Sequence, residues 1–204
     1  VQALEIDIEV ARSAIAQNGP LELLSQKSKE QNNQSDHPYQ ERPFADRLCR
    51  AVTGQQLSVR AAETIWARVI ESAENGPLMD HFAQVDPSVL KSCGLSRAKV
   101  KTVGAIAQAH LNGQLDPTAL GQLNPTERTQ HLTSIWGIGQ WTADMMGIFY
   151  FADADIWPDG DVTARKTLES LTSKRRKTIR TAARFAPYRS YLALHMWQHV
   201  DATP

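Results

Sequence analysis

Four aspartates stand close together between residues 153 and 161. Asp153, Asp155, Asp159 and Asp161 lie among apolar residues, a proline and a glycine, and a basic segment follows them. Carboxylates in such a group can bind a metal ion, cap a helix or stabilise positive charge that develops in a reaction. The residues around these aspartates indicate which of the three roles applies.

A calcium loop of the EF-hand type is excluded at this position. Counted from the first of these aspartates, the fifth, sixth and twelfth positions would need Asp or Asn, Gly and Glu, but they hold Trp157, Pro158 and Ala164. Asp161 stands directly before a helix predicted from about Val162, so helix capping is the simplest role for it. One carboxylate at a helix start can both cap the helix and take part in chemistry. We expect the other three aspartates to be turn and surface acids.

A second motif, Gly137-Ile138-Gly139, lies upstream between a short predicted helix and a longer one. Glycine permits positive φ and close approach of another molecule, and the amides at the start of the next helix can bind a phosphate. This is the pattern of a helix-hairpin-helix. Alone, this motif is more often a simple turn between helices, but Asp161 follows Gly139 by 22 residues, after one helix and one turn.

Signals for helix starts and ends recur along the chain, whereas alternating strand patterns of any length are missing. Three capping residues each precede a proline at the first helical position, and Glu127 completes a capping box with the third of them. These pairs are Asp86-Pro87, Asp116-Pro117 and Asn124-Pro125. We therefore predict an all-α fold.

Apolar periodicity predicts several of these helices directly. One should begin at Ser96 and end near Gly113, and a helix pair should surround the turn "TGQQLS" within residues 46–71. We expect the first to bury Val100, Val103, Ile106, Ala107 and Leu111, and the second helix of the pair to bury Ala62, Ile65, Trp66 and Val69. A helix over about residues 4–17 and an exposed polar connection over residues 26–43 precede them.

Length and composition permit one or two packed domains, since the chain has 204 residues and 42% hydrophobic content. No apolar run approaches the roughly 18 residues of a membrane span, and the first residues lack the pattern of a signal peptide. Cys49 and Cys93 are too few for a four-thiolate zinc or iron–sulfur site. We expect a soluble intracellular protein with two buried thiols.

The formal net charge is zero, but its distribution along the chain is uneven. Residues 1–46 carry eight acidic and four basic side chains, whereas residues 164–189 carry nine lysines and arginines against Glu169 alone. Such a basic face is typical of proteins that meet phosphates. A solvated helix face is the alternative explanation.

Taken together, these motifs resemble the helix-hairpin-helix DNA glycosylases, and within that superfamily the 3-methyladenine DNA glycosylase II branch, which acts on alkylated bases. The resemblance covers about residues 44–198. The matching stretches are "AVTGQQLSVRAAETIWARV" (51–69), "LKSCGLSRAKVKTVGAIA" (90–107), "LTSIWGIGQWTADM" (132–145), "DIWPDGDVTARK" (155–166) and "APYRSYLALHMW" (186–197). It implies a two-lobed fold with a central lobe over residues 46–153, a second lobe from residues 1–45 and 154–204, and an active cleft between them.

The resemblance implies that Asp161 is the catalytic aspartate. Removal of a base from deoxyribose passes through an oxocarbenium-like sugar, whose positive charge a fixed carboxylate can stabilise. An N-alkylated purine already carries positive charge and leaves as a neutral base, so a separate general acid is less necessary. Members of the superfamily that also cleave the strand carry a nucleophilic lysine two residues after the second hairpin glycine, where this chain has Trp141.

The family also implies which residues meet the DNA. The base pocket corresponds to Trp141, Met145 and Trp197, whose aromatic members attract a cationic base, although tryptophan on a helix is more often part of the core. Gln56 corresponds to the tip of the wedge loop that fills the gap left by a flipped nucleotide. The hairpin residues 137–139 and Arg165 are the expected contacts to phosphate, with plain surface exposure as the alternative for Arg165.

We therefore predict a monofunctional glycosylase that excises N-alkylated purines, of the 3-methyladenine and 7-methylguanine type, from double-stranded DNA in base excision repair. The alternatives are the same fold acting on oxidised or deaminated bases, and a non-catalytic module that binds damaged DNA. We expect a monomer that needs no cofactor or metal site, with a monovalent cation possible at the hairpin carbonyls. Its location would be the cytoplasm and nucleoid, or the nucleus in a eukaryote.

Overall fold

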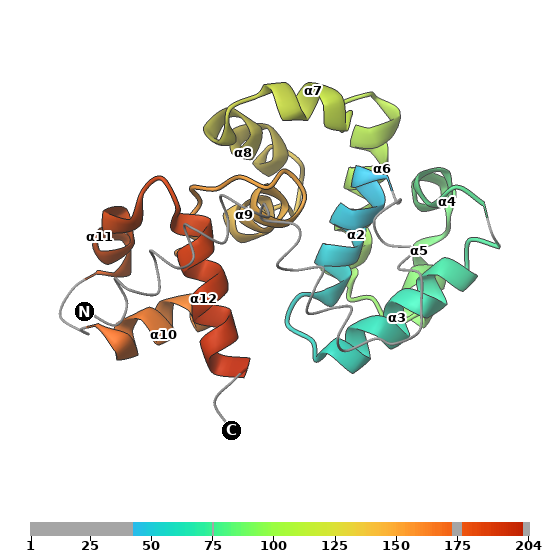
Figure 1. Cartoon of the computed structure of the whole chain (residues 1–204). Helices are drawn as coiled ribbons and strands as arrows, with labels where there is room; N and C mark the ends of the chain where they lie inside the picture. Colours follow the sequence, from blue (N-terminus) through green and yellow to red (C-terminus); the bar gives the residue numbers. More distant parts are fainter. Residues whose placement is uncertain (1–42, 75, 173–176, 202–204) are drawn as a thin grey trace, which may run out of the picture. The chain divides into compact units, whose positions relative to one another are not determined.

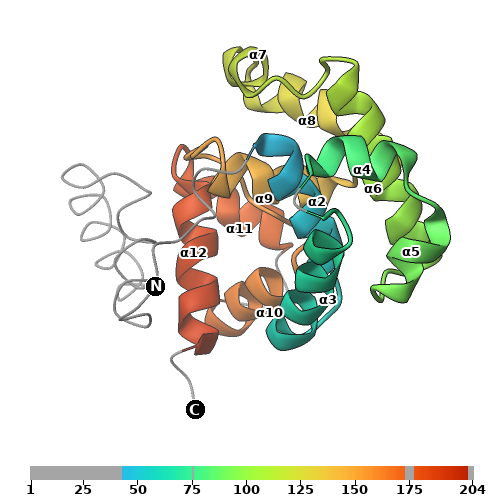
Figure 2. The ribbon, with the colours of Figure 1, turned by 90° about the vertical axis from the view of Figure 1, so that its right-hand side faces the viewer.

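The computed structural model describes residues 43–74, 76–172 and 177–201, and these ranges contain helices and turns but no strand (Figures 1 and 2). The prediction of an all-α fold is confirmed. The expected N-terminal helix and nearly all of the polar connection over residues 26–43 lie outside the described residues. The helices are α2 (Phe44–Gly54), α3 (Val59–Glu71), α4 (Leu78–Gln84), α5 (Pro87–Ser92), α6 (Arg97–Leu111), α7 (Pro117–Gln122), α8 (Pro125–Thr133), α9 (Gln140–Phe149), α10 (Val162–Leu171), α11 (Thr178–Ala182), the 3-10 helix η1 (Ala183–Phe185) and α12 (Arg189–Asp201).

The predicted helix caps are confirmed. Asp86 and Asp116 each accept a hydrogen bond from a backbone amide in the first turn of the helix that follows, over 2.7 and 3.0 Å. Asn124 and Glu127 form the reciprocal capping box at the start of α8. Ser96 caps α6. These side chains replace the hydrogen bonds that the first amides of a helix lack, and they explain why the short helices begin where they do.

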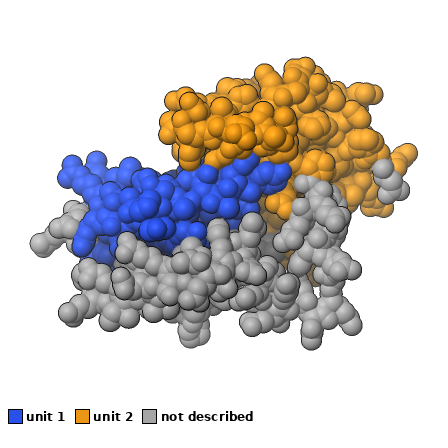
Figure 3. Space-filling model, turned by 45° about the horizontal axis from the view of Figure 1, so that its top comes forward, with its two compact units in different colours: residues 1–36, 144–204 blue, residues 37–143 orange. Residues whose placement is uncertain are grey.

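Contacts within the chain divide it into two compact units (Figure 3), one within residues 37–143 and one that includes residues 144–204. The division falls inside α9, whereas the sequence placed the boundary between lobes after residue 153. The predicted lobes, residues 46–153 and residues 1–45 with 154–204, stay a prediction about organisation.

In the unit within residues 37–143, α6 packs against α2, α4 and α5, and α2 packs against α3. Val103 and Ile106 on α6 and Leu48 on α2 are fully buried, as periodicity predicted for α6. The expectation for Leu111 was wrong, because this side chain is 50% exposed. Leu111 is the last residue of α6, and the buried leucine of this region is Leu115, which follows the turn.

In the unit that includes residues 144–204, α10 packs against α12. Its core is a cluster of buried side chains to which both helices and the loop before α10 contribute. The cluster contains Trp157, Ala164, Leu168, Ala182, Leu192, Ala193 and Met196, with Phe185 and Trp197 packed against it. Asp161 therefore stands at the start of a helix whose buried face is fixed by this core.

The loop between α9 and α10 is attached to the start of α12 by an ion pair. The Arg189 guanidinium donates to both carboxylate oxygens of Asp155, from Nε to Oδ1 over 2.6 Å and from Nη2 to Oδ2 over 2.9 Å. The backbone amide of Arg189 also donates to Oδ1. This bidentate contact holds the pKa of Asp155 below its ordinary value and raises that of Arg189.

Further hydrogen bonds restrain the same loop. The Ser190 hydroxyl donates to the carbonyl of Asp153 over 2.6 Å and accepts from the amide of Ile156 over 2.9 Å. The Asp159 carboxylate accepts from the indole of Trp157 and, over 2.7 Å, from the hydroxyl of Thr178. For Asp155 and Asp159 the expectation of turn and surface acids was therefore incomplete, since their carboxylates fix the segment that leads to Asp161.

The Asp155–Arg189 pair predicts a pH-dependent loss of stability in the Asp155→Asn variant. Because the pKa of Asp155 is lowered in the folded protein, its stabilising effect is present above its ordinary value of 3.8 and disappears as the pH falls through the lower folded value. We expect the variant to be less stable near neutral pH by on the order of 1 kcal/mol, since the pair is partly exposed. The difference should vanish in acid.

Thermal unfolding of wild type and variant between neutral pH and pH values below 3.8 measures this difference. Glu63→Gln on the exposed face of α3 controls for the loss of one carboxylate. A difference that persists at the lowest pH would contradict the expected contribution of the ionised carboxylate.

Candidate active site

The Asp161 carboxylate is held by donors from two helices. Its Oδ1 accepts a hydrogen bond from the backbone amide of Ala164 over 2.8 Å, which makes Asp161 the N-cap of α10. The same oxygen accepts from the indole Nε1 of Trp197 on α12 over 2.9 Å. The predicted cap is confirmed, and the second donor sets the orientation of the carboxylate relative to α12.

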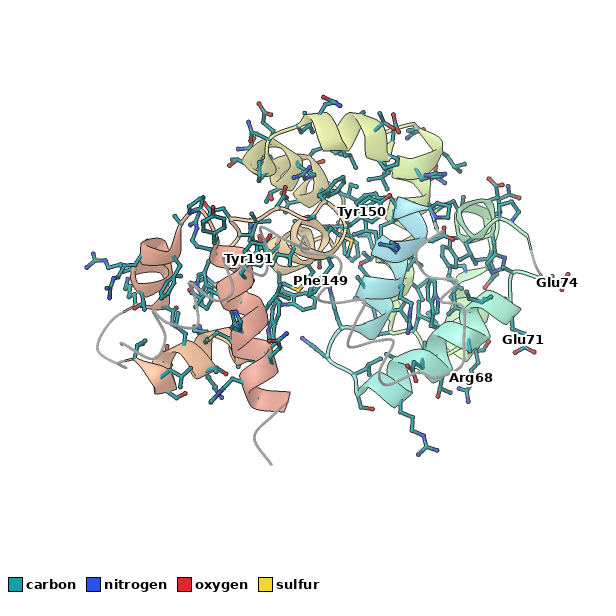
Figure 4. The ribbon with its side chains drawn as sticks, in the orientation of Figure 1. Arg68, Glu71, Glu74, Phe149, Tyr150 and Tyr191 are labelled. Atoms are coloured by element: carbon teal, nitrogen blue, oxygen red, sulfur yellow. The ribbon has the colours of Figure 1, made fainter. Side chains whose placement is uncertain are left out.

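The ring of Trp197 also packs against an aromatic side chain of α9. The rings of Trp197 and Phe149 stack with centroids 5.7 Å apart and planes inclined by 27°. Figure 4 shows Phe149 and Tyr150 at the end of α9 and Tyr191 on α12. Burial raises the pKa of the Tyr191 hydroxyl, with a further contribution from Tyr188, so this phenol stays neutral at physiological pH.

The expected pocket residues of α9 share one side of that helix. Trp141 and Met145 are one turn apart, and Phe149 follows one turn later, a spacing that places all three along one face. Trp141 is half-buried, whereas Met145 is only 7% exposed. Phe149 was not among the expected pocket residues, although its spacing from Met145 indicated that both lie on the same face of α9.

The hairpin between α8 and α9 requires glycine at its first position. Gly137 has φ of +84°, and a side chain at this residue would overlap that of Thr102 on α6. Ile138 is 5% exposed, and its amide donates to the carbonyl of Ile135 over 3.1 Å. The Ile138 side chain thus anchors the turn, and only its backbone could contact a ligand. Around Gly139 no atom lies within 4 Å of where a side chain would begin, so this side of the turn is open.

The turn between α2 and α3 holds its tip in an unusual conformation. Gln56 is exposed and has φ of +57°, a region that residues other than glycine rarely adopt. The preceding Gln55 donates from its side-chain amide to the Thr142 hydroxyl on α9 over 2.7 Å. The sequence drew attention to Gln56 but not to the contact that restrains its neighbour.

The basic residues of the C-terminal segment differ in their exposure and in their partners. Arg165 is half-buried on α10, one turn after Asp161, and Arg189 is engaged by Asp155. Lys177, Arg180 and Arg184 around α11 are exposed. Within the described ranges, therefore, part of the exposed positive charge of this segment lies on and around α11.

The described residues contain no group of three or more His, Cys, Asp or Glu side chains arranged to hold a metal ion. Cys49 and Cys93 are buried thiols, and burial raises the pKa of Cys49. None of the described helices has the length and apolar character needed to cross a membrane.

A glycine hairpin followed by a helix that an aspartate caps, within described residues that are all helices and turns, is the arrangement expected of helix-hairpin-helix DNA glycosylases. The sequence profile of the HhH-GPD superfamily of base excision DNA repair proteins matches residues 49–186, and the chain belongs to this superfamily. The family prediction made from the motifs is thus confirmed.

Individual proteins agree with this assignment. The chain is 31% identical over 170 residues to DNA-3-methyladenine glycosylase 1 of Schizosaccharomyces pombe, covering 79% of this chain and 72% of that protein. It is 29% identical over 160 residues to DNA-3-methyladenine glycosylase 2 of Escherichia coli, covering 72% and 55%. The structure of the Schizosaccharomyces pombe 3-methyladenine DNA glycosylase in complex with abasic DNA superimposes with a TM-score of 0.73 and 26% identity, covering 84% and 87%.

The packing of the hairpin predicts that Gly137→Ala destabilises the protein. The added methyl group meets the Thr102 side chain, and alanine disfavours the positive φ at this position. We expect a loss of about 2–4 kcal/mol in the free energy of unfolding, measured by denaturant titration.

Gly121→Ala is the matched control. Gly121 is exposed within α7 and has open space around it, so alanine should change stability by less than about 1 kcal/mol, in the stabilising direction. Equal effects of the two substitutions would contradict the close contact between Gly137 and Thr102.

Proposed function

We propose that the protein is a monofunctional DNA glycosylase that excises N-alkylated purines, of the 3-methyladenine and 7-methylguanine type, from double-stranded DNA in base excision repair. The observation that carries the proposal is the Asp161 carboxylate, capped onto α10 and bound by the Trp197 indole over 2.9 Å. Membership of the superfamily and the similarity to proteins named DNA-3-methyladenine glycosylase support the same activity.

Asp161 is proposed as the catalytic residue. When the bond between C1′ of the sugar and the purine nitrogen breaks, its electron pair goes to the base, and an alkylated purine cation leaves as a neutral molecule. Positive charge remains on the sugar, where a nearby carboxylate stabilises it. Water then bonds to C1′ and releases a proton, and Asp161 can orient that water.

The Asp161 carboxylate is already held in position before the reaction. Two donors already fix Oδ1, and α10 is held by a buried core. A preorganised negative charge stabilises a developing cation more effectively than one that must reorient. The geometry therefore favours a role that is electrostatic rather than nucleophilic.

The residue at position 141 favours base release without strand cleavage. A Schiff base with the sugar needs an amine, and the indole of Trp141 offers none. Trp141, Met145 and Trp197 are proposed to receive the flipped base, and Phe149 joins them because its ring stacks on Trp197. Aromatic faces favour a cationic base over a neutral one by about 1–2 kcal/mol.

The DNA itself is proposed to contact the hairpin, the wedge and the basic side chains. The backbone of residues 137–139 and Arg165 would meet phosphates, and Gln56 would fill the space of the flipped nucleotide. We propose that no resident cofactor is needed, that hairpin carbonyls can take a monovalent cation, and that the protein works as a monomer on DNA inside the cell.

Asp161→Asn tests the catalytic assignment. Asparagine keeps an oxygen that can accept from Ala164 and Trp197, so the helix cap and fold should persist while the negative charge is lost. We expect release of 7-methylguanine from methylated duplex DNA to fall on the order of 100-fold or more. Wild type should leave an intact abasic site that breaks only after alkali.

The outcomes separate the proposal from its rivals. No release by wild type from methylated DNA, but release from duplexes with oxidised or deaminated bases, would reassign the substrate. DNA binding without release from any of these substrates would identify a binding module.

Trp197→Phe tests the contact that orients the carboxylate. Phenylalanine keeps a ring next to Phe149 but lacks the indole donor, so the rate of base release should fall roughly tenfold, as expected for the loss of a hydrogen bond to a charged group. Trp66→Phe is the control, since no hydrogen-bond partner of the Trp66 indole is found among the described residues.

Single-turnover rates of both variants, with melting temperatures, complete this test. Loss of activity in Trp66→Phe equal to that in Trp197→Phe would show that the effect comes from general loss of tryptophan packing. It would contradict a specific role for the indole of Trp197.

A further inference from the structure

A lysine of α6 holds the end of α2 and the first residues of the wedge loop, residues 53–58. The Lys99 ammonium donates to the carbonyl of Thr53 over 2.9 Å and to that of Gln55 over 2.8 Å. The last carbonyls of a helix lack intrahelical partners and carry partial negative charge, so a cation there is favourable. Lys99 is half-buried, and burial lowers its pKa.

Gln55 is restrained a second time through its side chain. Its amide nitrogen donates to the hydroxyl of Thr142, which is 2% exposed on α9. The residue before the tip of the loop is thus fixed by α6 on its backbone and by α9 on its side chain. Gln56 follows with φ of +57°, a conformation that persists only where the surroundings impose it.

Helix α6 also supports the hairpin. Thr102 lies three residues after Lys99 and packs against Gly137. The wedge loop and the hairpin therefore share one rigid helix within the same unit. Loss of the Lys99 contact or of the Thr102 contact would therefore shift the wedge loop relative to the hairpin.

We propose that Lys99 is a positioning residue for base flipping, which holds the wedge loop so that Gln56 can enter the base stack. This inference rests on the proposed function. Extruding a nucleotide costs a few kcal/mol of stacking and pairing free energy. A wedge loop that changes conformation when it meets the base stack cannot offset this cost. Without the ammonium, two carbonyls lose their donor and the loop can adopt other conformations. Lys99 itself touches no reacting atom in this proposal.

The test uses a duplex oligonucleotide with one 7-methylguanine, placed either opposite cytosine or opposite an abasic-site analogue. With no partner base to break away from, flipping in the second duplex is easier and depends less on the wedge. Lys99→Met should lower the single-turnover rate about tenfold on the first duplex and less than about threefold on the second. Lys99→Arg should restore most of the rate, because its guanidinium can donate to both carbonyls.

Lys91→Met, an exposed lysine on α5, controls for the loss of one positive charge and should match wild type. If Lys99→Met does not fold, Lys99→Gln keeps an uncharged amide donor group and should show the same preference for the second duplex. Equal loss on both duplexes, or a Lys99→Met rate within twofold of wild type, overturns the inference alone. No base release by the wild-type protein overturns the proposed function, and the inference with it.

Discussion

The candidate site depends on one carboxylate oxygen that serves two helices. Asp161 Oδ1 accepts from the first turn of α10 and from the Trp197 indole on α12, so a single atom joins the start of one helix to the side of another. Both helices are packed against each other through a buried core. A charge held in this way is preorganised, which is the condition under which electrostatic stabilisation of a cationic sugar is effective.

The loop that delivers Asp161 is organised by the neighbouring acids. Asp155 pairs with Arg189, and Asp159 accepts from Trp157 and Thr178. The acids of this loop thus separate by partner: the carboxylates of Asp155 and Asp159 hold the segment, and that of Asp161 is presented at its end. The difference arises from the donors that the fold brings to each carboxylate, because the side chains themselves are chemically identical.

Helix α6 has the corresponding role in the other unit. It carries Lys99 against two carbonyls of the wedge loop and Thr102 against Gly137 of the hairpin. Both proposed DNA-contacting features are turns, which are intrinsically mobile, and both are stabilised from the same helix. Glycine at position 137 is then a requirement of packing as much as of any ligand.

The sequence by itself determined the all-α class, the start of the short helices and the family, because capping residues, prolines and apolar spacing act within a few residues of one another. It also placed Asp161 at the start of α10. It could not assign the partners of that carboxylate, since Trp197 is 36 residues away and meets it only after α12 packs on α10. The same holds for Lys99, which lies 46 and 44 residues from the carbonyls that it binds. It also holds for Leu111, whose exposure depends on where α6 ends. Local pattern reports which face of a helix is apolar, but tertiary packing alone decides which distant donor reaches a given acceptor.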